Sequence, residues 1–304
     1  MKKILLSLSM IAVVGVVVAG ATGAFFSDTE TSTGNTFTAG AIDLGVDNTS
    51  YYNGELSPST SWGLNFDLDT VCTFDPDGEG QLPPVEHPCL FFNFDDLKPG
   101  DFGEDTISLH VNNNPSWLCA DVKLVTNDDV TCNEPELDAG NDPTCAEPDS
   151  DVTDGDLAQN IDFLWWADDG DNVLEQDEQP LSAGVLGNLG VGNTATVDLV
   201  DATNNIFGTV GQPFPGGETL YVGKAWCFGD ITPAPTAIDD SVGNSPADPT
   251  NAGVTTGPAT PEDGGYTCSG ASSLNNASQT DSATMDISFR AEQSRNNPGF
   301  ECNP

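Results

Sequence analysis

Short runs in which apolar and polar residues alternate recur along this chain, and they restrict its fold more than any other feature. The stretches WLCADVKLV at 117–125 and LYVGKAWCF at 220–228 are clear examples. Alternation with a period of two places successive side chains on opposite faces of a strand, and helical periodicity is nearly absent beyond residue 23. The candidate strands are 36–46, 61–68, 89–94, 106–111, 117–126, 161–167, 194–199, 219–228 and 283–291. This series predicts an all-β fold, an antiparallel two-sheet β-sandwich that is jelly-roll-like.

Two segments between the candidate strands have the composition of loops. Residues 127–155 are rich in Asp, Glu, Pro and Asn, and residues 229–265 are rich in Pro, Ala, Gly and Asp. Strands on both sides of each segment are needed to complete one sandwich. We therefore interpret them as long acidic loop insertions in a single β-sandwich domain, residues 24–304, and not as linkers between domains.

The chain is strongly acidic, with 48 Asp and Glu against 7 Lys and Arg and a formal net charge of −41. Such a chain repels phosphate backbones and anionic membrane surfaces, so we expect no nucleic-acid partner. It attracts divalent cations, or hydrated monovalent cations at high salt. Because 37% of the residues are hydrophobic, including 15 Phe and 5 Trp, the chain can still form a packed core and is not a disordered acidic tail.

The N-terminus has the features of a signal peptide at residues 1–23. Lys2 and Lys3 precede an apolar run from Ile4 to Ala19, and small residues follow, so cleavage is expected near Ala21 or Gly23. A retained membrane anchor is the alternative, but the run is shorter than the ~20 residues that span a bilayer and no basic cluster follows it. The sequence thus predicts a secreted protein, extracellular or at the cell surface, with no stable membrane span after cleavage.

All of the cysteines lie beyond the signal segment, and their number is even. An even count in an exported chain predicts disulfides, and since no CxxC occurs a zinc site is the weaker alternative. Pairs Cys72–Cys89, Cys132–Cys145 and Cys227–Cys268 would close the predicted loops, although eight cysteines allow 105 pairings. The eight are Cys72, Cys89, Cys119, Cys132, Cys145, Cys227, Cys268 and Cys302.

A run of acidic residues follows the candidate strand 161–167 directly and is the strongest local sign of chemistry. Calcium prefers six to eight oxygen ligands, which closely spaced carboxylates around a glycine bend can supply. The spacing does not fit an EF-hand, and in so acidic a chain a solvated turn is the alternative. We name calcium as the candidate cofactor and the following residues as its candidate ligands: Asp168, Asp169, Asp171, Glu175, Asp177 and Glu178.

Catalytic motifs are not found. His87 and His110 are the two histidines, and neither lies in a His-Glu-x-x-His pattern. No GxSxG, P-loop or dinucleotide-binding fingerprint occurs, and carboxylate pairs arise by chance in a chain of this composition. The sequence therefore predicts a protein that is not an enzyme.

Two ordered motifs carry a family resemblance. The first motif consists of AFFSD at 24–28 and TFTAGAIDL at 36–44, and it resembles the mature start of the TasA and camelysin family of secreted fibre-forming proteins. The second is DLKPGD at 96–101, which precedes the strand 106–111 and resembles the Leu-Lys-Pro-Gly-Asp turn of that family. The resemblance implies a SipW-type signal peptide and a structural subunit of an extracellular fibre or pilus-like filament in a biofilm matrix or on a cell surface. The motifs cover about the first 120 residues. The name camelysin is associated with metalloproteases, for which this sequence has no recognisable ligand motif.

Self-association into such a filament requires a segment that can pair with a neighbouring subunit. Residues 24–35 are the candidate exchanged strand, which would complete a neighbour's sheet by donor-strand complementation, while pairing within the same sandwich is the alternative. The candidate assembly residues are Phe25, Phe26, Phe37, Ile42 and Leu44. A monomeric secreted calcium-binding or adhesive module is the alternative function.

Overall fold

The structure is a computed structural model of the chain. It describes residues 27–32, 36–38, 42–66, 71–75, 84–112, 114–132, 134–137, 142, 151–238, 259–271 and 274–303. The predicted signal peptide, Phe25, Phe26 and Cys145 lie outside these residues. No helix in these ranges is long and apolar enough to cross a membrane.

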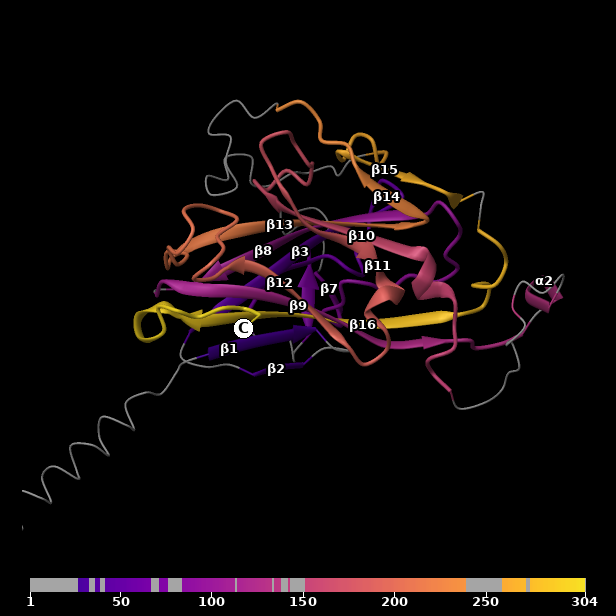
Figure 1. Cartoon of the computed structure of the whole chain (residues 1–304), viewed down its shortest axis with the longest axis horizontal. Helices are drawn as coiled ribbons and strands as arrows, with labels where there is room; N and C mark the ends of the chain where they lie inside the picture. The colour runs from indigo at the N-terminus through magenta and orange to yellow at the C-terminus, as the bar shows by residue number, and fades with distance from the viewer. Residues whose placement is uncertain are drawn as a thin grey trace, which may run out of the picture.

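Two antiparallel β-sheets form the body of the protein (Figure 1). The first sheet has the strand order β12-β9-β16-β1-β2, and the second has the order β11-β10-β13-β8-β3-β4, with β5 also paired to β3. The first contains β1 (Ser27–Ser32), β2 (Thr36–Thr38), β9 (Ser116–Asp128), β12 (Thr194–Val200) and β16 (Ser282–Gln293). The second contains β3 (Leu44–Tyr52), β4 (Glu55–Leu56), β5 (Trp62–Asn65), β8 (Phe102–Val111), β10 (Ile161–Asp168), β11 (Pro180–Val185) and β13 (Glu218–Phe228).

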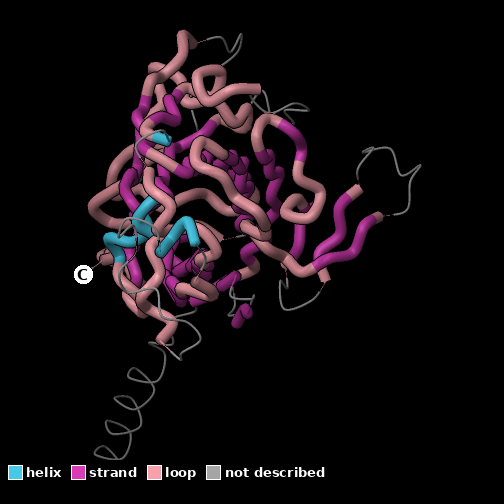
Figure 2. Tube along the Cα trace, turned by 90° about the vertical axis from the view of Figure 1, so that its right-hand side faces the viewer, coloured by secondary structure: helices cyan, strands magenta, loops and turns pink. Residues whose placement is uncertain are grey.

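The remaining described elements are short. Two small sheets pair β6 (Cys72–Phe74) with β7 (Val85–His87), and β14 (Asp230–Pro233) with β15 (Tyr266–Ser269). The helical elements that the structure describes include α2 (Glu134–Leu137) and single 3₁₀ turns at Leu157–Asn160, Leu186–Leu189 and Ser294–Asn296, and Figure 2 shows how little helix there is beside the strands. The long strands pass repeatedly from one sheet to the other, from β8 to β9, β9 to β10 and β12 to β13. These features confirm the predicted all-β, antiparallel two-sheet sandwich.

The main core lies between the two sheets and follows the alternation in the sequence. Leu118, Ala120, Val122 and Leu124 of β9 are buried, and they lie opposite apolar residues of β16 in the same sheet. On the second sheet, β3, β8 and β13 contribute the buried side chains of Leu44, Val46, Ile107, Leu109, Leu220 and Val222. Alternation thus decides which side chains enter this core.

A second, smaller core lies on the outer face of the second sheet. It contains Leu164, Trp166, Leu174, Ala225, Cys227, Ile231 and Tyr266. The β14–β15 pair lies beyond this sheet, on the side away from the first sheet (Figure 1). Because both faces of this sheet are covered, β8 is buried at every position from Gly103 to Leu109, including the charged residues Glu104 and Asp105.

Disulfides link distant parts of the sandwich. Cys72–Cys89 and Cys227–Cys268 are bonded as expected, Cys132 is disulfide-bonded, and none of the described cysteines is free. The sequence did not suggest the pair Cys119–Cys302, which ties the C-terminal segment to β9. Its two cysteines are 183 positions apart, so no local pattern indicates their pairing.

Several details differ from the strands expected from the sequence, and β4, β6, β7, β11 and β15 were not among the candidate strands. The candidate strand 36–46 is divided into β2 and the start of β3, and β14 lies at the beginning of the segment 229–265 that was expected to be a loop. Residues 89–94 were expected to be a strand and are not one. Instead, Cys89 is bonded to Cys72, and Phe91, Phe92 and Phe94 contact other aromatic rings in the core. The apolar side chains of this run are thus buried by packing, without pairing of the backbone to a neighbouring strand.

Close packing of a tryptophan on a glycine joins β10 to β13 on the outer face. A Cβ added at Gly223 would lie 2.0 Å from the Trp166 ring, so a side chain there forces the ring or the strands apart. We expect Gly223→Ala to lower the free energy of unfolding by about 1–3 kcal/mol, as overpacking does. Gly63→Ala in the exposed part of β5 is the control, because its Cβ would meet only the Thr73 carbonyl oxygen, at 3.9 Å. Urea unfolding measures both, and equal effects would contradict the packing argument.

Candidate metal centre

The acidic run predicted as a calcium site forms the connection between β10 and β11, and most of it is buried. β10 ends at Asp168, Gly170 turns the chain with a φ of +110°, and Leu174 enters the outer core. Asp168, Asp169, Glu175 and Glu178 are all less than 7% exposed and Asp171 is half-buried, whereas Asp177 is exposed. Burial of so many carboxylates is costly unless hydrogen bonds, protons or a cation compensate their charge.

Backbone N–H groups of the loop satisfy part of this requirement. Asp168 Oδ2 accepts hydrogen bonds from the N–H groups of Gly170 and Asn172 at 3.0 and 3.3 Å. Its Oδ1 accepts from Trp166 Nε1 at 3.0 Å. Glu178 accepts from the N–H groups of Asp169 and Glu175 at 2.9 and 3.0 Å, so its carboxylate closes the loop on itself. The loop conformation therefore depends on its own acidic side chains.

The same carboxylates bind protons unusually tightly. Burial, opposed in part by the hydrogen bond from Trp166, raises the pKa of Asp168 to about 7. Burial together with the charges of Asp168 and Asp169 raises the pKa of Asp171 to about 8. Burial and the charge of Asp168 raise the pKa of Glu178 to about 10. Near neutral pH the loop thus holds protons that a bound cation would displace.

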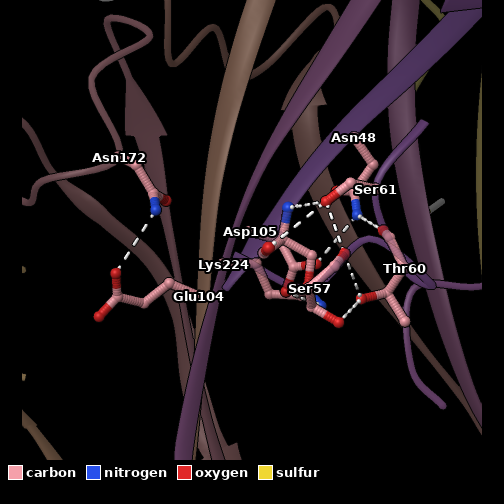
Figure 3. A network of polar contacts seen from close by, with 9 residues as sticks. Asn48, Ser57, Thr60, Ser61, Glu104, Asp105, Asn172 and Lys224 are labelled. Atoms are coloured by element: carbon pink, nitrogen blue, oxygen red, sulfur yellow. Dashed lines mark hydrogen bonds and ion pairs between the residues drawn. The ribbon is translucent and has the colours of Figure 1, made fainter. Parts of the chain in front are cut away.

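Asn172 connects the loop to the second sheet. Its Nδ2 donates to Glu104 Oε2 at 3.4 Å, and Tyr266 O–H donates to Glu104 Oε1 at 2.6 Å. Figure 3 shows Glu104 extending toward Asn172 on one side of β8. Burial raises the pKa of Glu104 to about 8. Asn172 is 1% exposed, and its Oδ1 has no hydrogen-bond partner among the described residues, so it is an oxygen available to a cation.

A second acidic cluster combines two residues of the segment 127–155 with the distant residue Asp281. Carboxylate oxygens of Asp129, Glu136 and Asp281 lie within 4.8 Å of one another, and Asp129 and Glu136 are buried. Burial and the charge of Asp129 raise the pKa of Asp281 to about 7. This cluster could hold a metal, and the only sequence signal for it was the general acidity of residues 127–155. Asp198, Asp201 and Cys302 form a similar group, but the Cys302 sulfur is bonded to Cys119.

Both histidines are engaged with oxygen atoms of the protein. His87 contacts the carbonyl oxygens of Pro88 and Ser61 at 2.8 and 2.9 Å. His110 contacts Asp47 Oδ2 at 2.6 Å and Thr219 Oγ1 at 3.0 Å. The acidic clusters described above contain no histidine and offer oxygen donors. Oxygen donors suit a hard cation such as calcium, whereas the zinc of peptidases is typically bound by histidines.

Residues 1–79 match a family model described as camelysin metallo-endopeptidase. This region is similar to that family, as the N-terminal motifs suggested. Comparison with curated proteins and with solved structures found no match.

Proposed function

We propose that this chain is an exported structural subunit that assembles into an extracellular fibre through its N-terminal segment. In this structure of a single chain, β1 pairs within its own sandwich, which is the alternative named above, and the observation that carries the proposal is the position of β1 close to the edge of the sheet. Its residues pair with β16, from Ser27 opposite Glu292 to Ser32 opposite Ile287, and its other neighbour is the three-residue strand β2. The N-terminal segment thus lies near the edge of the first sheet and follows directly on Phe25 and Phe26.

Such a strand can be exchanged at low cost in free energy. If β1 leaves its own sheet, β16 presents the same row of N–H and C=O groups to the β1 of a neighbour, so hydrogen bonds lost in one subunit are regained with the next. An exchange that is not reciprocal generates an open filament. Ile42 and Leu44 lie in the chain's own core, which limits the exchanged segment to the residues before them.

The similarity of residues 1–79 to the camelysin metallo-endopeptidase family supports the export part of the proposal, because it covers the signal-type start of the chain. Calcium is the proposed cofactor, bound by Asp168, Asp169, Asp171 and Glu178 with the Asn172 oxygen. A bound cation would neutralise buried carboxylates that the backbone only partly satisfies. The cluster of Asp129, Glu136 and Asp281, whose carboxylate oxygens lie within 4.8 Å of one another, also favours a second candidate function, that of a monomeric secreted calcium-binding or adhesive module.

Replacing Phe25 and Phe26 together with Asp should stop filament formation while the monomer still folds. Two charges would enter positions that the exchange model buries in the next subunit, at a cost of several kcal/mol. Electron microscopy of the purified secreted protein detects the filaments, and circular dichroism detects the β-rich monomer.

The control variant replaces Val210 and Ile238 with Asp, because these side chains are 58% and 42% exposed. The control should assemble like the unmodified protein. Filaments of the Phe25/Phe26 variant at the wild-type concentration would overturn the exchange mechanism. A wild-type protein that stays monomeric across salt and calcium concentrations would favour the second function, and proteolysis abolished by a chelator would show an enzyme.

A further inference from the structure

A lysine and an aspartate lie directly opposite each other inside the sandwich. Lys224 of β13 is the register partner of Asp105 of β8, and Asp105 is the partner of Ser50 of β3. The neighbouring rung, Ile107 with Val222, belongs to the core between the sheets. Lys224 is 0% exposed and Asp105 1%, so neither head group reaches water.

The two head groups are in direct contact. Lys224 Nζ lies 2.6 Å from Asp105 Oδ2. Apart from this contact, neither Lys224 Nζ nor Asp105 Oδ2 has a hydrogen-bond partner within the described residues. A buried ammonium normally directs its three donors to acceptors, which makes this arrangement exceptional.

Aromatic rings enclose the lysine. Its Nζ lies 3.6 Å from the centre of the Phe92 ring and 5.7 Å from that of Phe91. Burial lowers the pKa of Lys224 to about 8, and burial raises the pKa of Asp105, so both groups are shifted toward their neutral forms. A neutral amine carries the free electron pair that a nucleophile needs.

Asn48 supplies a donor at the other carboxyl oxygen. Its Nδ2 donates to Asp105 Oδ1 at 3.0 Å and to the Thr60 carbonyl at 2.7 Å, so the amide is held in place. Figure 3 shows Asn48 and Lys224 around Asp105, on the opposite side of β8 from Glu104. A fixed N–H at this position stabilises negative charge that develops on Oδ1.

We propose that Lys224 and Asp105 condense into an intramolecular isopeptide bond between β8 and β13. The ammonium first gives a proton to the carboxylate, which leaves an amine and a carboxylic acid. The Nζ electron pair then attacks Cγ, the Cγ–Nζ bond forms, the Cγ–Oδ2 bond breaks, and Oδ2 leaves as water with a second proton from the nitrogen. The reaction needs no oxidant, reductant or other reactant.

Two physical terms favour the bond. Holding the groups in contact makes the reaction intramolecular, and well-oriented pairs reach effective molarities on the order of 10⁵ M or more. The amide also replaces two buried ionisable groups, whose desolvation is costly. The resulting link resists reductants, unlike the disulfides, and its existence does not depend on the proposed fibre function.

Tryptic digestion of the purified full chain, after reduction and alkylation under denaturing conditions, tests the bond. An amide at Lys224 blocks cleavage after that residue. We expect one product in which residues 124–290 are joined to the fragment that ends at Lys123 and contains Asp105, lighter by one water than the sum of its parts. Fragmentation in the mass spectrometer should place the link at the two side chains.

Lys224→Met and Asp105→Ala provide the unlinked standards, and because the digestion is done on denatured chains they serve even if they fold poorly. Both should have the full mass expected from their sequences. A linked product in the wild type that is missing from both variants establishes the bond. Separate wild-type fragments 124–224 and 225–290 with an unmodified Lys224 would overturn it and leave the pair as an ion pair.

Discussion

Raising the pH from about 5 to about 8 in calcium-free buffer should lower the melting temperature of this protein. The pKa values of Asp168, Asp171 and Glu178 are raised to about 7, 8 and 10 in the folded chain. Unfolded carboxyl groups titrate near pH 4, so between that pH and the folded pKa the folded state holds more protons. Stability therefore falls with rising pH, by about 1 kcal/mol per pH unit for each fully buried group.

Calcium should reverse this dependence, because a cation binds the ionised carboxylates and competes with protons. We expect millimolar calcium to raise the melting temperature strongly near pH 8 and little near pH 5. Exposed carboxylates are already ionised throughout this window, so general charge repulsion stays nearly constant across it. Thermal unfolding at fixed ionic strength, followed by circular dichroism, measures both effects.

A pair of variants tests whether the loop is responsible. Asp169→Asn together with Asp171→Asn should abolish the calcium increment while the stabilisation by monovalent salt remains. Asp177→Asn, at the exposed position of the same loop, should behave like the wild type. If both variants lose the calcium-induced rise in melting temperature, or if neither does, the loop is not its source. The calcium effect would then come from general screening or from the cluster of Asp129, Glu136 and Asp281.

Replacing Cys119 and Cys302 together with Ala should lower the free energy of unfolding by about 5 kcal/mol. The bond joins residues 183 positions apart, and in the chain-entropy model a longer closed loop contributes more stability. Replacing Cys72 and Cys89, which are 17 positions apart, should cost about 3 kcal/mol. Chemical denaturation of the two double variants gives the comparison, and a larger loss for the shorter loop would contradict the entropic explanation.

The acidic loop could be predicted from the sequence because its residues are contiguous. A strand ending in a dense run of carboxylates is visible without a structure, and the loop does lie at the end of β10 with most of those carboxylates buried. The sequence did not indicate the cluster of Asp129, Glu136 and Asp281, since Asp281 comes from a distant segment that precedes β16. The sequence did not indicate the position of Asn172 either, because a single amide within an acidic run has no distinguishing pattern.

The sequence by itself determined the fold class and the composition of the core. Alternation with a period of two assigns each side chain to one face of a strand, and this property is local, so it can be recognised in one segment at a time. The same holds for the even number of cysteines in a chain that begins like an exported protein, which predicted disulfides but not all of their partners.

Tertiary structure alone decided which charged residues are buried and what they meet. Lys224, Asp105 and Glu104 occur in strands whose own pattern does not distinguish them from surface charges. Their burial depends on the register of β8 against β13 and on the cover of the outer face by β14, β15 and the acidic loop. Register and layer order arise from contacts between distant segments, and such contacts leave no periodic signal in a single sequence.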